Sequence, residues 1–206
     1  RLEVLTAEAR ARLEDGELVA AAERALLGEQ LVRFHRGRRD HRGDVSPGRA
    51  RLTVGLAGTA VDLAERLVSA DDTPVRDASS SDASERMNRW LVQARRFLAL
   101  AEHALQNGRY ARAVHFAYHA HGSALKAVIL PGGITEEELV AMAELANDLY
   151  GQAQAAVGDT PTELQERLLA LAGRLIERGE EALEQGYKRG VAALWRAAVI
   201  SRWLLG

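Results

Sequence analysis

The chain has 206 residues, a formal net charge of −2 from 27 basic and 29 acidic residues, and no cysteine. The near balance of charge gives no general attraction to nucleic acid or anionic lipid, and the lack of cysteine excludes disulfides, thiolate catalysis and cysteine-based metal centres. No apolar run is long enough for a membrane-spanning helix. We therefore expect a soluble protein, either cytoplasmic or exported after loss of an N-terminal leader.

Residues 1–70 are expected to form a first helical repeat unit, which is a hairpin followed by a single helix. Helices are predicted over residues 2–15 and 17–36. The arginine-rich segment 33–48 is interpreted as a solvated loop, partly balanced by acidic residues, rather than a phosphate or nucleic-acid contact, because it lacks interleaved aromatic residues for base stacking. Serine as N-cap and proline at the first helical position then begin a third helix at residues 46–47.

Residues 71–83 form a polar linker with a proline and a run of serines, and residues 84–206 hold the second and third repeat units. Thr160, followed by Pro161 and Glu163, is expected to be the N-cap of a long helix. The helices expected in this part of the chain cover residues 82–107, 109–130, 135–157, 160–185 and, after the glycine at 186, the remainder.

Three turn glycines share the same flanking pattern. Leucine stands three residues before Gly16, Gly108 and Gly186, and alanine or valine stands five residues after each of them. Such short connections between helices produce antiparallel pairs. We therefore predict an all-α fold of about eight helices, built as three antiparallel hairpins joined by single helices.

The hairpin around Gly108 resembles a tetratricopeptide (TPR) motif, a helical repeat that binds proteins and peptides. The resemblance implies a right-handed helical stack and a non-enzymatic scaffold or accessory subunit. Its partner would be a protein or peptide, with no nucleic acid and no cofactor. The residues that occupy the motif's characteristic positions are Phe97, Leu100, Ala101, Gly108, Tyr110, Ala113 and Ala120.

The binding surface of such a scaffold would lie away from the alanine stripes of the central hairpin. His115 and His119 are four residues apart, so they share a helix face and could coordinate a metal ion together. No carboxylate falls at a fitting position, and we favour a polar histidine patch without metal. The residues expected to bind the partner are Arg96, His103, Arg112, His115 and His119.

The pattern LxxGRYxxAVxxAxxAxxxALKAVIL, over residues 105–130, also resembles the helical hairpin of HEPN domains, a family that includes RNases and nucleotide-binding proteins. Nuclease members carry an arginine, four to six residues, and then a histidine. Arg109 and His115 have this spacing, as do Arg36 and His41. The resemblance implies that His115 acts as a general base on a ribose hydroxyl while Arg109 stabilises phosphate charge. A HEPN-like RNA-binding or RNase domain is therefore the alternative function.

Overall fold

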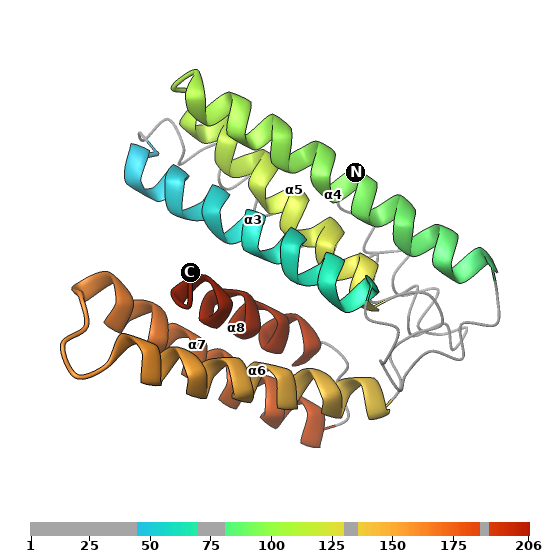
Figure 1. Cartoon of the computed structure of the whole chain (residues 1–206), viewed down its shortest axis with the longest axis vertical. Coiled ribbons are helices and arrows are strands. Elements are labelled where there is room, and N and C mark those ends of the chain that lie inside the picture. Colours follow the sequence, from blue (N-terminus) through green and yellow to red (C-terminus); the bar gives the residue numbers. More distant parts are fainter. Residues whose placement is uncertain (1–44, 70–80, 130–135, 186–189) are drawn as a thin grey trace, which may run out of the picture. The chain divides into compact units, whose positions relative to one another are not determined.

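The computed structural model describes residues 45–69, 81–129, 136–185 and 190–206, which hold six α-helices and no strand (Figure 1). The helices are α3 (Pro47–Ser69), α4 (Ser81–Gln106), α5 (Tyr110–Ile129), α6 (Glu136–Val157), α7 (Glu163–Glu184) and α8 (Gly190–Leu204). The all-α class is confirmed. The two helices expected before residue 37 and the arginine-rich segment up to residue 44 lie outside the described residues.

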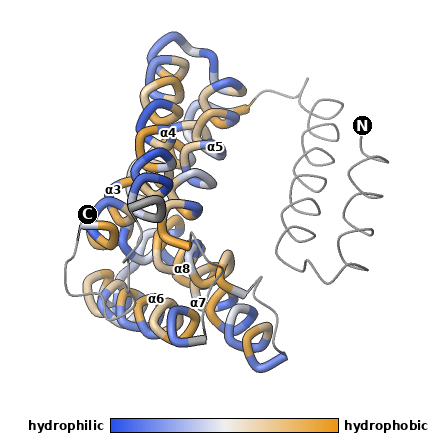
Figure 2. The backbone as a smooth tube through the Cα atoms, turned by 90° about the vertical axis from the view of Figure 1, so that its right-hand side faces the viewer, coloured by the Kyte–Doolittle hydropathy of each residue, from blue (hydrophilic) through white to orange (hydrophobic). Residues whose placement is uncertain are grey.

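Helices α3, α4 and α5 pack together, with α5 against both of the others. Their shared interior is dominated by alanine, which lets helix backbones approach closely. Figure 2 shows hydrophilic and hydrophobic positions alternating along α4, as expected for a helix with one buried face. The fully or nearly fully buried alanines of this group are Ala50, Ala57, Ala60, Ala64, Ala94, Ala101, Ala113, Ala117, Ala120, Ala124 and Ala127.

The turn between α4 and α5 is a Schellman motif built on Gly108. This glycine has a φ of 68°, a left-handed conformation that costs glycine little. The Gly108 N–H donates to the Leu105 carbonyl at 3.0 Å, and the Arg109 N–H donates to the Ala104 carbonyl at 2.8 Å. Both bonds satisfy carbonyls that the end of α4 would otherwise leave unpaired. The predicted turn at Gly108 is therefore confirmed, and it fixes where α5 begins.

Helices α6, α7 and α8 form a second group of mutual contacts. The backbones of α7 and α8 approach closely at two glycines. A Cβ added to Gly179 would lie 2.6 Å from Leu194 Cγ, and one added to Gly190 would lie 2.5 Å from the Gly179 carbonyl oxygen. Helix α8 is buried on most of its circumference because it also packs against α3, where Trp203 covers Gly55.

The start of α7 differs from the sequence prediction. Its N-cap is Thr162, not Thr160. The Thr162 side chain accepts a hydrogen bond from the Gln165 N–H, and the Gln165 side chain accepts one from the Thr162 N–H. This reciprocal capping box satisfies two backbone donors at once.

A right-handed TPR-like stack of about eight helices is not confirmed. The α4–α5 hairpin is completed by α3, and the α7–α8 hairpin is completed by α6, so each hairpin packs first on a single helix. Contact between the two groups is made by α3 with α8, and His121 on α5 also meets Trp195 on α8. Residues Pro47–Gly206 form one compact unit that spans the expected linker at 71–83. The division into repeat units at that linker remains a prediction.

None of the described helices combines the length and the apolar character that crossing a bilayer requires.

Candidate functional site

The start of α5 is a positively charged surface. A shallow, open depression there is lined by Arg109, Tyr110, Ala111 and Arg112. The first turn of α5 contains no acidic residue. The unpaired N–H groups of a helix N-terminus and the positive end of its dipole attract anions, and two arginine side chains add full charges to that attraction. The charge at this end of the helix is therefore suited to an anionic group.

His115 lies one turn further along α5, three residues after Arg112, so the two share a helix face. Burial lowers the pKa of the half-buried His115. Its imidazole is therefore neutral at neutral pH and able to accept a proton. Arg109 is six residues before His115, which corresponds to about 9 Å along the helix axis.

His119 continues the same face and packs against aromatic rings. Its ring centroid lies 4.5 Å from that of His115 in an edge-on arrangement and 5.0 Å from that of Phe97 on α4. Burial, and then electrostatic repulsion from protonated His115 and from Lys126, lower the pKa of His119. Among the described residues, no three histidine, aspartate or glutamate side chains are placed to hold a metal ion together.

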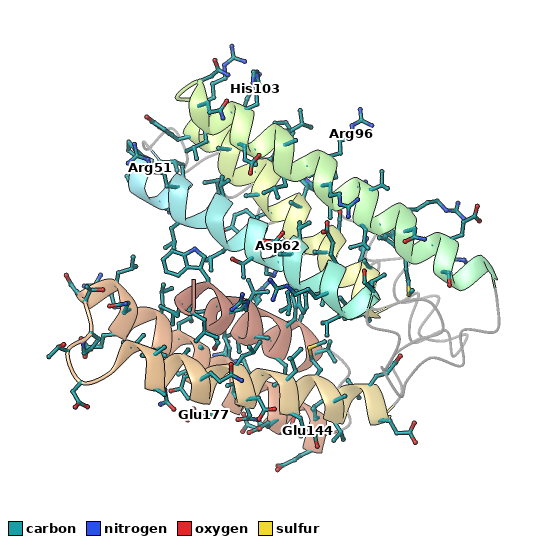
Figure 3. All side chains as sticks on the ribbon, in the orientation of Figure 1. Arg51, Asp62, Arg96, His103, Glu144 and Glu177 are labelled. Atoms are coloured by element: carbon teal, nitrogen blue, oxygen red, sulfur yellow. The ribbon has the colours of Figure 1, made fainter. Side chains whose placement is uncertain are left out.

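The expected binding residues thus fall into two sets. Arg112, His115 and His119 follow one face of α5 at intervals of three and four residues. Arg96 and His103, seven residues apart on α4, share a different line and project outward from that helix in Figure 3. The amide nitrogen of Asn107 hydrogen-bonds the His103 carbonyl at 2.7 Å and contacts its ring nitrogen at 3.3 Å, which ties His103 to the turn.

The face of α5 extends beyond the residues that were expected to bind a partner. The Lys126 ammonium lies 4.3 Å from the centroid of the Trp90 ring on α4, a cation–π contact. The sequence held a signal for it, because Lys126 is seven residues after His119 and Trp90 is seven residues before Phe97. Each interval of seven residues spans about two helical turns. Because α4 and α5 are antiparallel, two turns forward along α5 lie beside two turns backward along α4.

The remaining histidine of α5 is on the other side of the helix. His121 packs against the indole of Trp195 on α8, with ring centroids 6.3 Å apart. Burial, followed by the positive charge of Arg196, lowers its pKa to about 4. Its buried Nε2 atom has no hydrogen-bond partner among the described residues. The imidazole of His121 therefore faces α8, on a different side of α5 from His115 and His119.

Comparison with protein families finds that residues 87–177 match the model of the HEPN domain. The match begins in α4, covers the hairpin and all of α6, and ends within α7. Comparison with curated proteins and with solved structures finds no significant match.

The family match corrects the leading interpretation of the sequence. The weaker resemblance, to HEPN domains, is confirmed over these residues, whereas the TPR resemblance is not. The expectation of a non-enzymatic protein is wrong on this finding, because HEPN domains are generally RNase-type or nucleotide-related enzymatic domains. Convergence explains the error, since any short helical hairpin with a glycine turn and alanine-rich facing stripes satisfies most of the TPR pattern.

Proposed function

We propose that the α4–α5 hairpin is the working part of an RNA-cleaving HEPN-type domain. The observation that carries the proposal is the family match over residues 87–177, which encloses the arginine–histidine spacing of Arg109 and His115. The second such pair, Arg36 and His41, falls outside the match. The partner that we propose is therefore RNA, and not the protein or peptide that the TPR resemblance implied.

The local chemistry supports this reaction. His115, kept neutral by burial, takes the proton from a ribose 2′-hydroxyl. The resulting oxygen attacks the adjacent phosphorus, and the bond from phosphorus to the 5′-oxygen breaks. That oxygen takes a proton from water. Arg109, at the N-terminal end of α5, stabilises the charge that develops on the phosphate. The products are a 2′,3′-cyclic phosphate and a 5′-hydroxyl.

Cleavage of a labelled single-stranded RNA by the purified protein tests the proposal, with the new ends identified chemically. Removing a general base costs on the order of 10²- to 10⁴-fold in rate. We expect a loss of this size in His115→Ala and a substantial loss in Arg109→Ala. His103→Ala is the matched control, because His103 is an exposed histidine of α4 near the same turn.

The proposal is wrong if the wild-type protein cleaves no RNA, or if His115→Ala cleaves as fast as the control. Circular dichroism of each variant shows whether the helices are intact. RNA binding without cleavage would identify an RNA-binding domain instead.

A further inference from the structure

A seam of two parallel rows of side chains runs between α4 and α5. The α5 row comprises Arg112, His115, His119, Gly122 and Lys126, at intervals of three and four residues. The α4 row comprises Trp90, Gln93, Phe97 and Leu100, at the same intervals. Contacts join the rows at two places, where Phe97 meets His119 and where Trp90 meets Lys126.

The charged side chains of this seam are all positive. Helix α5 contains no aspartate or glutamate. Among the described residues, neither Arg112 nor Lys126 forms an ion pair, whereas Arg89, Arg95 and Arg167 are each paired with a glutamate. The α5 row therefore ends in two cations that no described carboxylate pairs with, although the protein as a whole has a net charge of −2.

Rings and open space lie between these two cations. The imidazoles of His115 and His119 occupy the middle of the row. Tyr118 is 62% exposed, so most of its ring is open to solvent. Gly122 is four residues after Tyr118, and a Cβ added to it would meet nothing within 4 Å. A planar group therefore has room to lie beside Tyr118.

We propose that this seam is a binding track for single-stranded RNA that extends from the cleavage site at the start of α5 to Lys126. The inference rests on the proposed function for its ligand and adds the track's position and length. Arg112 and Lys126 contact phosphates at its two ends, and unstacked bases pack on Tyr118 and on the histidine rings. Cations that alternate with stacking platforms are the usual means of holding single-stranded nucleic acid.

The length of the track predicts how much RNA it holds. Arg112 and Lys126 are 14 residues apart, which is about 21 Å along the helix. A stacked strand advances about 3.4 Å for each nucleotide, and an unstacked strand advances further, so this span accommodates at most about six nucleotides. An acidic peptide would gain less binding energy than RNA from the rings between the two cations. Competition by an acidic peptide is therefore one of the outcomes of the test.

The sharpest perturbation is Gly122→Glu. The new side chain enters open space, and glutamate is a better helix former than glycine, so the fold should be retained. The carboxylate would lie one turn before Lys126 and would neutralise it from within the row. Gly151→Glu on α6 is the matched control, because Gly151 is also helical, is exposed and has nothing within 4 Å of an added Cβ.

The probe is a fluorescent 2′-O-methyl oligouridylate, which lacks the nucleophilic hydroxyl and cannot be cleaved. Fluorescence anisotropy would compare oligomers of about eight and about three nucleotides. We expect the longer one to bind at least tenfold more tightly. Gly122→Glu should weaken its binding about tenfold or more, and Gly151→Glu should stay within about twofold of wild type. Lys126→Gln should reduce the slope of log affinity against log salt by about one.

Several results would overturn the track. These are no binding of the oligomer, equal binding by both glycine variants, an unchanged salt slope in Lys126→Gln, or an acidic peptide that competes as well as RNA. The two proposals fail separately. Oligomer binding that only Gly122→Glu weakens, without cleavage of ordinary RNA, rejects the nuclease and keeps the track. Cleavage of RNA together with equal binding by the glycine variants rejects the track and keeps the nuclease.

Discussion

Mild acid should destabilise this protein through the buried His121. The imidazole packs against Trp195, and its pKa in the folded protein is lowered to about 4 from an ordinary value of 6.5. Burial is the main cause, and the positive charge of Arg196 is the second. Because the folded pKa is lowered, the unfolded chain binds a proton at a pH where the folded protein does not. Stability is therefore fully present above pH 6.5 and falls as the pH drops towards 4.

The size of the effect follows from the pKa difference. Each unit is equivalent to about 1.4 kcal/mol, so His121 costs about 2 kcal/mol of unfolding free energy between pH 7 and pH 5 and about 3 kcal/mol in total. The pKa values of His115 and His119 are also lowered, so they act in the same direction. A variant is needed to isolate the contribution of His121.

His121→Leu is the informative variant. Leucine has a similar volume and removes both the titration and a buried Nε2 atom that no described residue hydrogen-bonds. We expect the variant to be at least as stable as wild type at neutral pH and to lose about 2 kcal/mol less on acidification. Urea unfolding followed by circular dichroism at the two pH values measures both quantities. Equal losses in the variant and the wild type would refute this account of His121.

Three further outcomes are expected. Gly179→Ala should lower the unfolding free energy by about 2 kcal/mol in a urea titration, because its Cβ would lie 2.6 Å from Leu194 Cγ, and an unchanged value would show that α7 and α8 can separate freely. Gly122→Ala should raise the unfolding free energy by about 0.5–1 kcal/mol and hence the melting temperature, because the added methyl group meets nothing. Cleavage of RNA should remain constant from neutral to mildly alkaline pH and decline only below pH 6.5, because burial lowers the pKa of His115, and a rate that rises on acidification would exclude His115 as the general base.

Much of the helical architecture is visible in the sequence because it depends on local rules. The turn at Gly108 was predictable, since an asparagine–glycine pair after an apolar stripe ends a helix whatever surrounds it. The start of α3 at Pro47 was predictable for a similar reason, because serine followed by proline satisfies a helix N-terminus locally. The start of α7 was misplaced by two residues, since Thr160 and Thr162 are both acceptable caps and hydrogen bonding with Gln165 selects the second.

The candidate site could be predicted only in part. Residues on one helix, such as Arg112, His115 and His119, are related by helical spacing alone, so the sequence places them on a common face. Contacts between helices depend on the rotation of each helix about its axis. The pairing of Lys126 with Trp90 and of His119 with Phe97 was therefore missed, and so was the contact of His121 with Trp195.

By itself the sequence determined the helical class, the main helix boundaries and the arginine–histidine spacing, because each depends on residues within a few turns of one another. The tertiary structure decided which helices are neighbours. It placed α3 against α4 and α5, and α8 among α3, α6 and α7, so the hairpins do not follow one another in the predicted stack. It also decided which histidines reach the surface, because burial is a property of the packed helices and not of any one segment.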